Sequence, residues 1–128
     1  MSDTIDRLTV HDLVGGEETF RRLAHAFYSR VYADPLLRPL FPDDRVGAEE
    51  RIALFLTQYF GGPTTYSDRR GHPRLRLRHM PFAIGQAERD AWLGHMRAAI
   101  DDLDIAEPAR TAMRDYFDSA ATFMINKT

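Results

Sequence analysis

Apolar side chains recur along this chain with the spacing of amphipathic helices. In the first clear block they follow one another every three or four residues, which places them on one helix face: Phe20, Leu23, Ala24, Phe27, Tyr28 and Val31. Asp34-Pro35 ends this block, because the residue before a proline is pushed out of the α-helical region. A short helical turn over residues 9–14 precedes it and stops at Gly15-Gly16.

The same spacing predicts three further long helices, over residues 47–60, 86–103 and 107–126. Pro108 suits the first turn of the last one. A short apolar piece of Leu36, Leu37, Leu40 and Phe41 separates the first two helices. The predicted apolar faces are Ala48, Ile52, Phe55, Leu56 and Tyr59; then Trp92, Met96, Ala99, Ile100 and Leu103; then Met113, Tyr116, Phe117, Ala120, Ala121 and Met124.

The segment between the second and third helices has little periodicity. Gly61-Gly62-Pro63 stops the helix, and residues 64–73 are polar, which predicts a long loop of the kind that often carries function. Residues 74–79 alternate between apolar and polar, as a strand does, but the chain offers no partner strand. We therefore predict a short helical turn there, and an all-α fold with four principal helices.

Composition narrows the function classes. The 128 residues suit one domain over positions 1–128, and 17 basic against 19 acidic residues leave no net charge that favours DNA or an anionic membrane. The absence of cysteine excludes disulfides, thiolate metal sites and cysteine nucleophiles. The acidic opening does not resemble a signal peptide, and no apolar run is long enough for a membrane span. We expect a cytoplasmic protein; one lysine against sixteen arginines is typical of a bacterial source.

His79 is the most informative of the five histidines. It lies between an arginine-rich turn and Met80-Pro81-Phe82, which keeps it beside apolar groups. Structural packing explains most such histidines, but a single histidine in apolar surroundings is also what a haem iron requires, because the porphyrin supplies four nitrogens itself. No pair of histidines has the spacing of a zinc site. Packing or solvent exposure explains the others: His11 and His25 on the surface, His72 in the loop, and His95 partly buried near Trp92.

A run of arginines leads up to His79: Arg69, Arg70, Arg74, Arg76 and Arg78. A solvated surface is the ordinary explanation. Nucleic-acid binding is disfavoured, because no aromatic residues are interleaved and the rest of the chain is not basic. A site for carboxylates is the third interpretation, since the forked donors of arginine suit them.

Tyr28 and Trp92 lie on the apolar faces of two different helices. A buried tyrosine or tryptophan normally finds a hydrogen-bond partner for its polar atom, so incidental core packing is one interpretation. The other is that both side chains point into one cavity and donate to a bound ligand. No glycine-rich phosphate loop is present, and no catalytic triad can be inferred from order and spacing.

These residues resemble the group II truncated haemoglobins over nearly the whole chain. The proximal segment carries most of the likeness: residues 65–79 (TYSDRRGHPRLRLRH), then Pro81-Phe82, Ile84-Gly85 and residues 87–93 (AERDAWL). Upstream, the likeness continues in order through Val14-Gly15-Gly16, Thr19-Phe20, Phe27-Tyr28, residues 48–51 (AEER) and residues 59–63 (YFGGP). The resemblance implies a shortened globin, a two-over-two helical sandwich around haem b (iron protoporphyrin IX), with the helices of Tyr28 and Ala48 forming one pair.

The resemblance also implies residue roles. His79 is the axial iron ligand through Nε2, with its other ring nitrogen donating to a backbone carbonyl. Tyr28 and Trp92 are the distal donors, and Ala48 stands where many globins carry a distal histidine or glutamine. Phe41 is implied to pack against the haem plane, Ile52 to form an apolar wall of the distal pocket, and Phe82 to contact the haem. The implied partners of the propionates are Arg51, Tyr66, His72 and Arg78. Phe41 departs from the tyrosine that many group II members carry there.

The implied activity is binding of O2, NO and CO. Dioxygen on ferrous haem carries partial negative charge, and a hydrogen bond to a charged group contributes about 1.5–3 kcal/mol, so two donors predict slow O2 release. Slow release suits tight binding, or oxidation of NO to nitrate with an external reductase, better than rapid oxygen transport. Weak peroxidase turnover is the enzymatic alternative, expected to be poor without a distal histidine. The third alternative is a globin-like fold without haem that serves as a sensor or interaction module. The chain is expected to be a monomer or homodimer, with no nucleic-acid or membrane partner.

Overall fold

A computed structural model describes residues 9–127, and these residues form helices and loops without any strand. The acidic opening, residues 1–6, for which no signal peptide is predicted, lies outside this range. The helices are α2 (Val10–Val14), α3 (Glu17–Val31), the 3-10 helix η1 (Arg38–Leu40), α4 (Arg45–Tyr59), α5 (Thr65–Arg70), α6 (Leu75–His79), α7 (Gln86–Asp102) and α8 (Ala109–Phe123).

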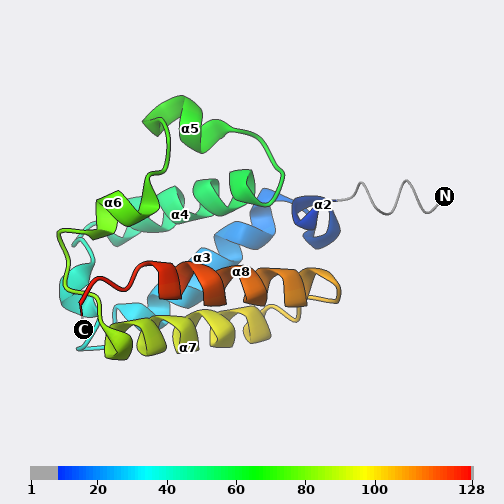
Figure 1. The fold of residues 1–128 in the computed structure, drawn as a ribbon. Helices are drawn as coiled ribbons and strands as arrows, with labels where there is room; N and C mark the ends of the chain where they lie inside the picture. Colours follow the sequence, from blue (N-terminus) through cyan, green and yellow to red (C-terminus); the bar gives the residue numbers. More distant parts are fainter. Residues whose placement is uncertain (1–8, 128) are drawn as a thin grey trace.

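The four long helices form two pairs. α3 packs on α4, α7 packs on α8, and α3 also contacts α7, which joins the pairs. In Figure 1, α7 and α8 run side by side below α4, α5 lies at the top, and α6 overlaps the left end of α4 in this view. Buried side chains from the predicted helix faces fill the core, among them Phe20, Phe27, Met96, Ile100, Met113 and Phe117. The predicted all-α, two-over-two arrangement is confirmed.

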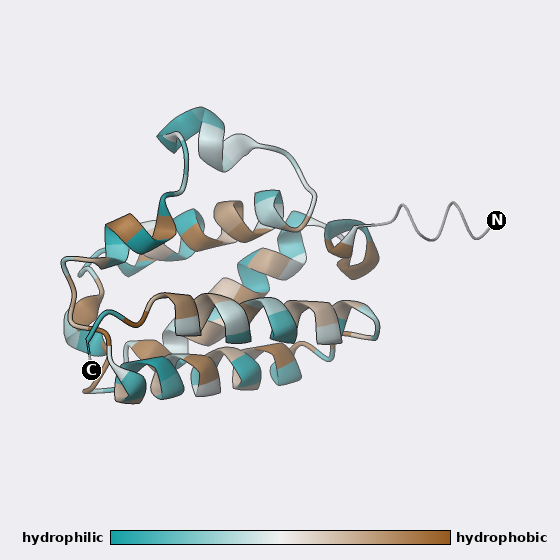
Figure 2. Ribbon diagram, in the orientation of Figure 1, coloured by the Kyte–Doolittle hydropathy of each residue, from teal (hydrophilic) through white to brown (hydrophobic). Residues whose placement is uncertain are grey.

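Amphipathic patterning explains why these segments are helical. Figure 2 shows hydrophilic and hydrophobic residues alternating around each long helix. Capping sets where they begin: the Asp44 carboxylate accepts a 3.0 Å hydrogen bond from the Gly47 amide, so α4 starts two residues before the predicted position. None of the helices in the described range is long and apolar enough to cross a membrane.

The predicted loop over residues 64–73 is wrong, because its first part forms helix α5. One face of this six-residue helix is fixed to α4: the Gln58 side chain bonds both the amide (2.9 Å) and the hydroxyl (2.7 Å) of Ser67, and Tyr66 packs against Phe55. A helix this short shows no usable periodicity in sequence. The helical turn predicted over residues 74–79 is confirmed as α6.

The last helix ends at Phe123, before the predicted residue 126. The chain leaves the helix because the Asn126 amide donates to the Ile84 carbonyl oxygen (2.8 Å), which ties this end to the loop before α7. Two side-chain placements also differ from prediction. His11 is not simply solvated, since it stacks on Phe20 with ring centroids 6.4 Å apart. Tyr59, assigned to an apolar helix face, is 53% exposed.

Candidate functional site

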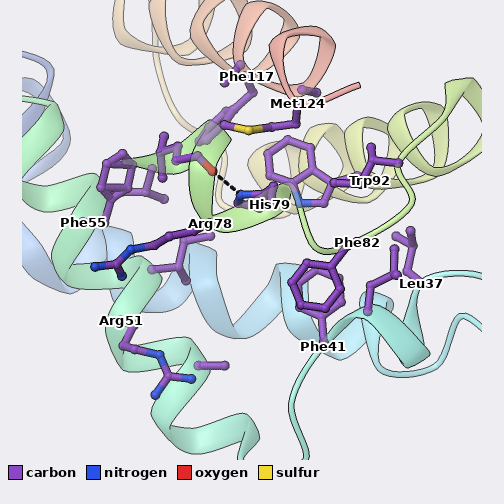
Figure 3. Close-up of a pocket in the computed structure, with 18 of the residues that line it drawn as sticks. Leu37, Phe41, Arg51, Phe55, Arg78, His79, Phe82, Trp92, Phe117 and Met124 are labelled. Carbon is purple, nitrogen blue, oxygen red and sulfur yellow. Dashed lines mark hydrogen bonds between the residues drawn. The ribbon is translucent and has the colours of Figure 1, made fainter. Parts of the chain in front are cut away.

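A cavity of about 380 Å³ lies between the helix pairs, with walls from α3, η1, α4, α5, α6, α7 and α8. Most of its walls are apolar. Figure 3 shows phenylalanines from several elements, Phe41, Phe55, Phe82 and Phe117, surrounding it together with Leu37 and Met124. The few polar groups in the lining are therefore the ones that can orient a ligand.

His79, the last residue of α6, presents its ring to this cavity. Its Nδ1 lies 2.6 Å from the carbonyl oxygen of Leu75, one helical turn earlier, as the dashed line in Figure 3 marks. Because a carbonyl oxygen can only accept, the neutral imidazole carries its proton on Nδ1. Nε2 is then left with a free electron pair, and no residue in the range 9–127 is hydrogen-bonded to it. This is the state in which an imidazole binds a metal.

Two aromatic donors line the same cavity from different helices. Tyr28 comes from α3 and is 6% exposed, and Trp92 comes from α7. The ring of Phe27 packs against both, with centroids 5.2 Å from Tyr28 and 5.1 Å from Trp92. Burial raises the pKa of the Tyr28 phenol, so it remains a neutral donor. Neither the phenol nor the indole N–H bonds another described residue, which leaves both free for a ligand.

Arginines border the cavity where it meets solvent. Arg51, Arg70 and Arg78 line it, and none of them forms a salt bridge with a carboxylate in residues 9–127. Arg78 instead donates from Nη1 to the Tyr66 hydroxyl at 3.0 Å. Arg89 also lines the cavity but is paired with Asp90 at 3.0 Å. The unpaired guanidinium groups can therefore bind an anionic part of a ligand whose apolar body fills the cavity.

The cavity brings together ten of the eleven site residues expected from the sequence: Tyr28, Phe41, Ala48, Arg51, Ile52, Tyr66, Arg78, His79, Phe82 and Trp92. His72 does not line it. That side chain is exposed, and its Nδ1 accepts a 3.0 Å hydrogen bond from the Arg74 amide. The roles assigned to these residues remain predictions, while their common location is a structural fact.

Sequence reasoning missed part of the lining. The largest omission is one side of α8, where Tyr116, Phe117, Ala120, Ala121 and Met124 face the cavity. Their helical spacing identified them as an inward face, but spacing does not distinguish a packed core from a cavity wall. Arg70 and Arg89 were also missed as lining residues, although Arg70 belongs to the arginine run.

The remaining histidines lie elsewhere. The His25 side chain is 71% exposed, and His95 Nε2 pairs with Asp34 at 2.7 Å between α7 and the end of α3. Within the described part of the chain, no cluster of three His, Cys, Asp or Glu side chains could hold a metal ion.

Comparison with known proteins agrees with this geometry. The family model of the bacterial-like globins matches residues 9–126. A haemoglobin structure from Chloroflexus aurantiacus is 57% identical, with a TM-score of 0.92 over 94% of this chain and 100% of that one. A truncated oxygen-avid haemoglobin from Bacillus subtilis is 38% identical, with a TM-score of 0.88 over 93% and 100%.

Sequence comparison alone leads to the same group. A group 2 truncated hemoglobin of Bacillus subtilis is 41% identical over 113 residues, which cover 88% of this chain and 86% of that protein. With the two helix pairs, the cavity between them and the histidine at its wall, the chain belongs to the bacterial-like globin family and, within it, to the group II truncated haemoglobins.

Proposed function

We propose that this protein binds haem b in the cavity and, through it, O2, NO and CO, with slow release of O2. The observation that carries the proposal is the state of His79. Of the five histidines, all within the described residues, it alone lines the cavity, and its bond to Leu75 leaves Nε2 free there.

The residues present fit a haem. An apolar, planar ligand with two carboxylates needs apolar walls and cations at one edge. The cavity offers aromatic side chains such as Phe41 and Phe82, and arginines without carboxylate partners in residues 9–127, such as Arg51 and Arg78. His79 would hold the iron, Phe41, Ile52 and Phe82 would contact the ring, and Arg51, Tyr66 and Arg78 would bind the propionates.

The 2.6 Å bond between His79 Nδ1 and Leu75 gives the histidine a fixed tautomer and ring orientation. A ligand histidine held in this way is a stronger base at its other nitrogen, which strengthens metal binding. Asn126 supports the segment that follows, because its side-chain amide donates to the carbonyl oxygens of His79 (3.2 Å) and Phe82 (2.8 Å). These hydrogen bonds orient His79 without any contribution from the haem.

Tyr28 and Trp92 supply hydrogen-bond donors on the remaining side of the cavity. Haem supplies the iron that binds diatomic ligands and, given an external reductase, the redox chemistry by which O2 oxidises NO to nitrate. Tyr28 stays neutral at physiological pH because burial raises its pKa, so it can donate to a ligand that carries negative charge. Each donated bond contributes about 1.5–3 kcal/mol, which corresponds to tenfold or more in the rate of release. The oxygen-avid haemoglobin of Bacillus subtilis is similar in fold and supports this expectation.

Visible absorption spectra test the proposal. The purified protein is reconstituted with haemin and measured in the ferric state, after reduction with dithionite, and after addition of CO. We expect a Soret band that shifts at each step. In a His79→Ala variant the band should be lost or altered, with recovery on addition of imidazole, which replaces the missing side chain.

A matched control uses His25→Ala, because His25 is largely exposed and lies outside the cavity. Its spectra should equal those of the unaltered protein. A Soret band and CO shift that are the same in the His79→Ala variant would remove His79 from the iron. Failure of the unaltered protein to take up haemin would overturn the proposal as a whole.

A further inference from the structure

Tyr59 and Tyr116 form an aromatic pair that the binding of diatomic ligands does not use. Their ring centroids are 4.0 Å apart with an angle of 33° between the planes, the shortest ring separation among the described aromatic pairs. Tyr59 is the last residue of α4 and Tyr116 lies in the middle of α8, so the pair spans the gap between the two helix pairs. At this separation the two phenol rings are in van der Waals contact, with their planes inclined to each other.

The pair joins the cavity to the protein surface. Tyr116 lines the cavity, whereas Tyr59 does not line it and is 53% exposed to solvent. On the cavity side, Tyr116 contacts Phe117 (5.3 Å between centroids), and Phe117 contacts Trp92 (5.9 Å). A continuous series of aromatic rings therefore runs from the distal tryptophan to a tyrosine at the surface.

The two hydroxyl groups differ in their surroundings. Burial, with a smaller contribution from Tyr59, raises the pKa of Tyr116 to about 12, so this phenol is protonated at neutral pH. Neither hydroxyl bonds another residue in the range 9–127. Because Tyr59 is exposed, water can accept its proton when the ring loses an electron. When the pair is oxidised, a dissolved reductant can therefore transfer an electron to it at the exposed Tyr59 ring.

The other tyrosines are not arranged in this way. Tyr28 and Tyr32 are neighbours, but their centroids are 5.7 Å apart and their planes stand at 87°, which points one ring edge at the other face. Tyr66 is buried, and its hydroxyl oxygen accepts a hydrogen bond from Arg78. Among the tyrosines of the described range, Tyr59 and Tyr116 are therefore the pair with the closest rings.

We propose that Tyr59 and Tyr116 form an oxidisable pair that carries one-electron oxidation from the cavity to the surface, and that a peroxide joins them covalently when no external reductant is present. The proposal rests on the haem function proposed above, since haem supplies the site where the peroxide is reduced. Hydrogen peroxide takes two electrons and two protons and its O–O bond breaks to give two waters. Each tyrosine loses one hydrogen atom overall, and a carbon–carbon bond forms between the two rings.

An external donor changes the outcome in a defined way. A small one-electron reductant such as ascorbate can return an electron to the exposed Tyr59 ring before the rings couple. The reductant is then oxidised at the protein surface, without entering the cavity. The pair would serve as a surface site for oxidising small reductants, and its covalent coupling would mark turnover without them.

Mass spectrometry provides the test. The haem-loaded protein is treated with hydrogen peroxide, digested with trypsin, and searched for a cross-link between the peptides of residues 52–69 and 115–127, with loss of two hydrogen atoms. We expect dityrosine fluorescence, a protein that still runs as a monomer in denaturing gels, and fragment ions that place the link at Tyr59 and Tyr116. Both Tyr59→Phe and Tyr116→Phe should abolish it, and ascorbate should suppress it.

Tyr32→Phe is the matched control, because Tyr32 lies outside the cavity and outside this pair; it should leave the cross-link unchanged. A second oxidant, a photo-excited ruthenium complex with persulfate, needs no haem and separates this proposal from the haem function. If the protein takes up no haemin, this oxidant should still couple Tyr59 to Tyr116. A haem-loaded protein that consumes peroxide without forming this link, or that links other tyrosines instead, would overturn the proposal.

Discussion

The side-chain amide of Asn126 donates a hydrogen bond from Nδ2 to the main-chain carbonyl oxygen of His79, at 3.2 Å. The same NH2 group donates to the Phe82 carbonyl oxygen at 2.8 Å, and Oδ1 accepts from the Ile84 amide at 2.9 Å. One side chain near the end of the chain therefore fixes the segment that follows the histidine of the cavity, across more than forty residues of sequence.

Replacing Asn126 with alanine should loosen this segment. The variant loses three side-chain hydrogen bonds, each worth about 1 kcal/mol net, so the free energy of unfolding should fall by about 1–3 kcal/mol. Haem should also leave faster, because the histidine loses its backbone support. Urea unfolding measures the first effect, and transfer of haem to excess apomyoglobin measures the second. Asn126→Asp retains the acceptor for Ile84 and should be intermediate; equal haem loss in all three proteins would contradict the supporting role.

Tyr28→Phe should accelerate O2 dissociation by about tenfold or more, since the variant keeps the ring and removes one donor to a negatively charged ligand. Stopped-flow replacement of O2 by CO gives the rate. Trp92→Phe should act in the same direction, and the double variant should release O2 fastest. Tyr32→Phe, outside the cavity, is the control and should not change the rate. An unchanged rate in Tyr28→Phe would remove this phenol from the ligand side.

Arg78 and His72 allow a direct comparison of two residues that were both expected near the haem carboxylates. Arg78 lines the cavity and is held by the Tyr66 hydroxyl, whereas His72 is exposed and bonds the Arg74 amide. Arg78→Gln should raise the rate of haem loss several-fold, and added salt should reduce the difference, because screening weakens the contribution of the charge. His72→Ala should have little effect. The reverse order of the two variants would contradict this assignment.

Much of the fold could be predicted from sequence because the long helices bury one face each. The spacing of residues such as Phe20, Phe27, Met96 and Phe117 predicted both the helices and their inward sides. The same reasoning failed for α5, because six residues are too few for a helical period to emerge. Its position depends instead on the two hydrogen bonds between Gln58 and Ser67. The end of α8 depended on a contact with a distant residue, the hydrogen bond from the Asn126 amide to Ile84.

The hydrophobic pattern of the sequence predicted less of the candidate site than of the fold. Residue types made His79, Tyr28 and Trp92 candidates, but their packing against a common cavity followed only from resemblance to a family. The wall formed by α8 was missed because inward-facing positions look the same whether they meet a core or a cavity. The contact of Tyr59 with Tyr116 was not predicted either. Helical spacing placed Tyr59 on a buried apolar face and said nothing about which residue of another helix it meets, whereas in the structure its side chain is half exposed.

Asp34 and His95 provide a prediction on pH. The hydrogen bond from His95 at 2.7 Å, together with the Leu36 amide, holds the pKa of the Asp34 carboxyl below its usual range. A carboxyl whose pKa is lower in the folded protein stabilises it above the unfolded value of about 3.9, and this contribution is lost as the pH falls through the lower, folded-state pKa. Asp34→Asn should therefore cost stability near neutral pH and progressively less in acid.

The expected cost is about 1 kcal/mol or less, since both side chains are partly exposed to solvent. Urea unfolding from neutral pH down to about pH 3 measures it, with the difference between the variant and the unaltered protein shrinking once the pH falls below about 3.9. Asparagine retains the acceptor for the Leu36 amide but replaces the oxygen that faces His95 with an NH2 group, so the difference reports on the charged contact with His95. Asp43→Asn is the control, because that carboxylate is fully exposed. If the difference in the free energy of unfolding between Asp34→Asn and the unaltered protein stays constant across this range, the pair stabilises the fold through packing and not through the charge of Asp34.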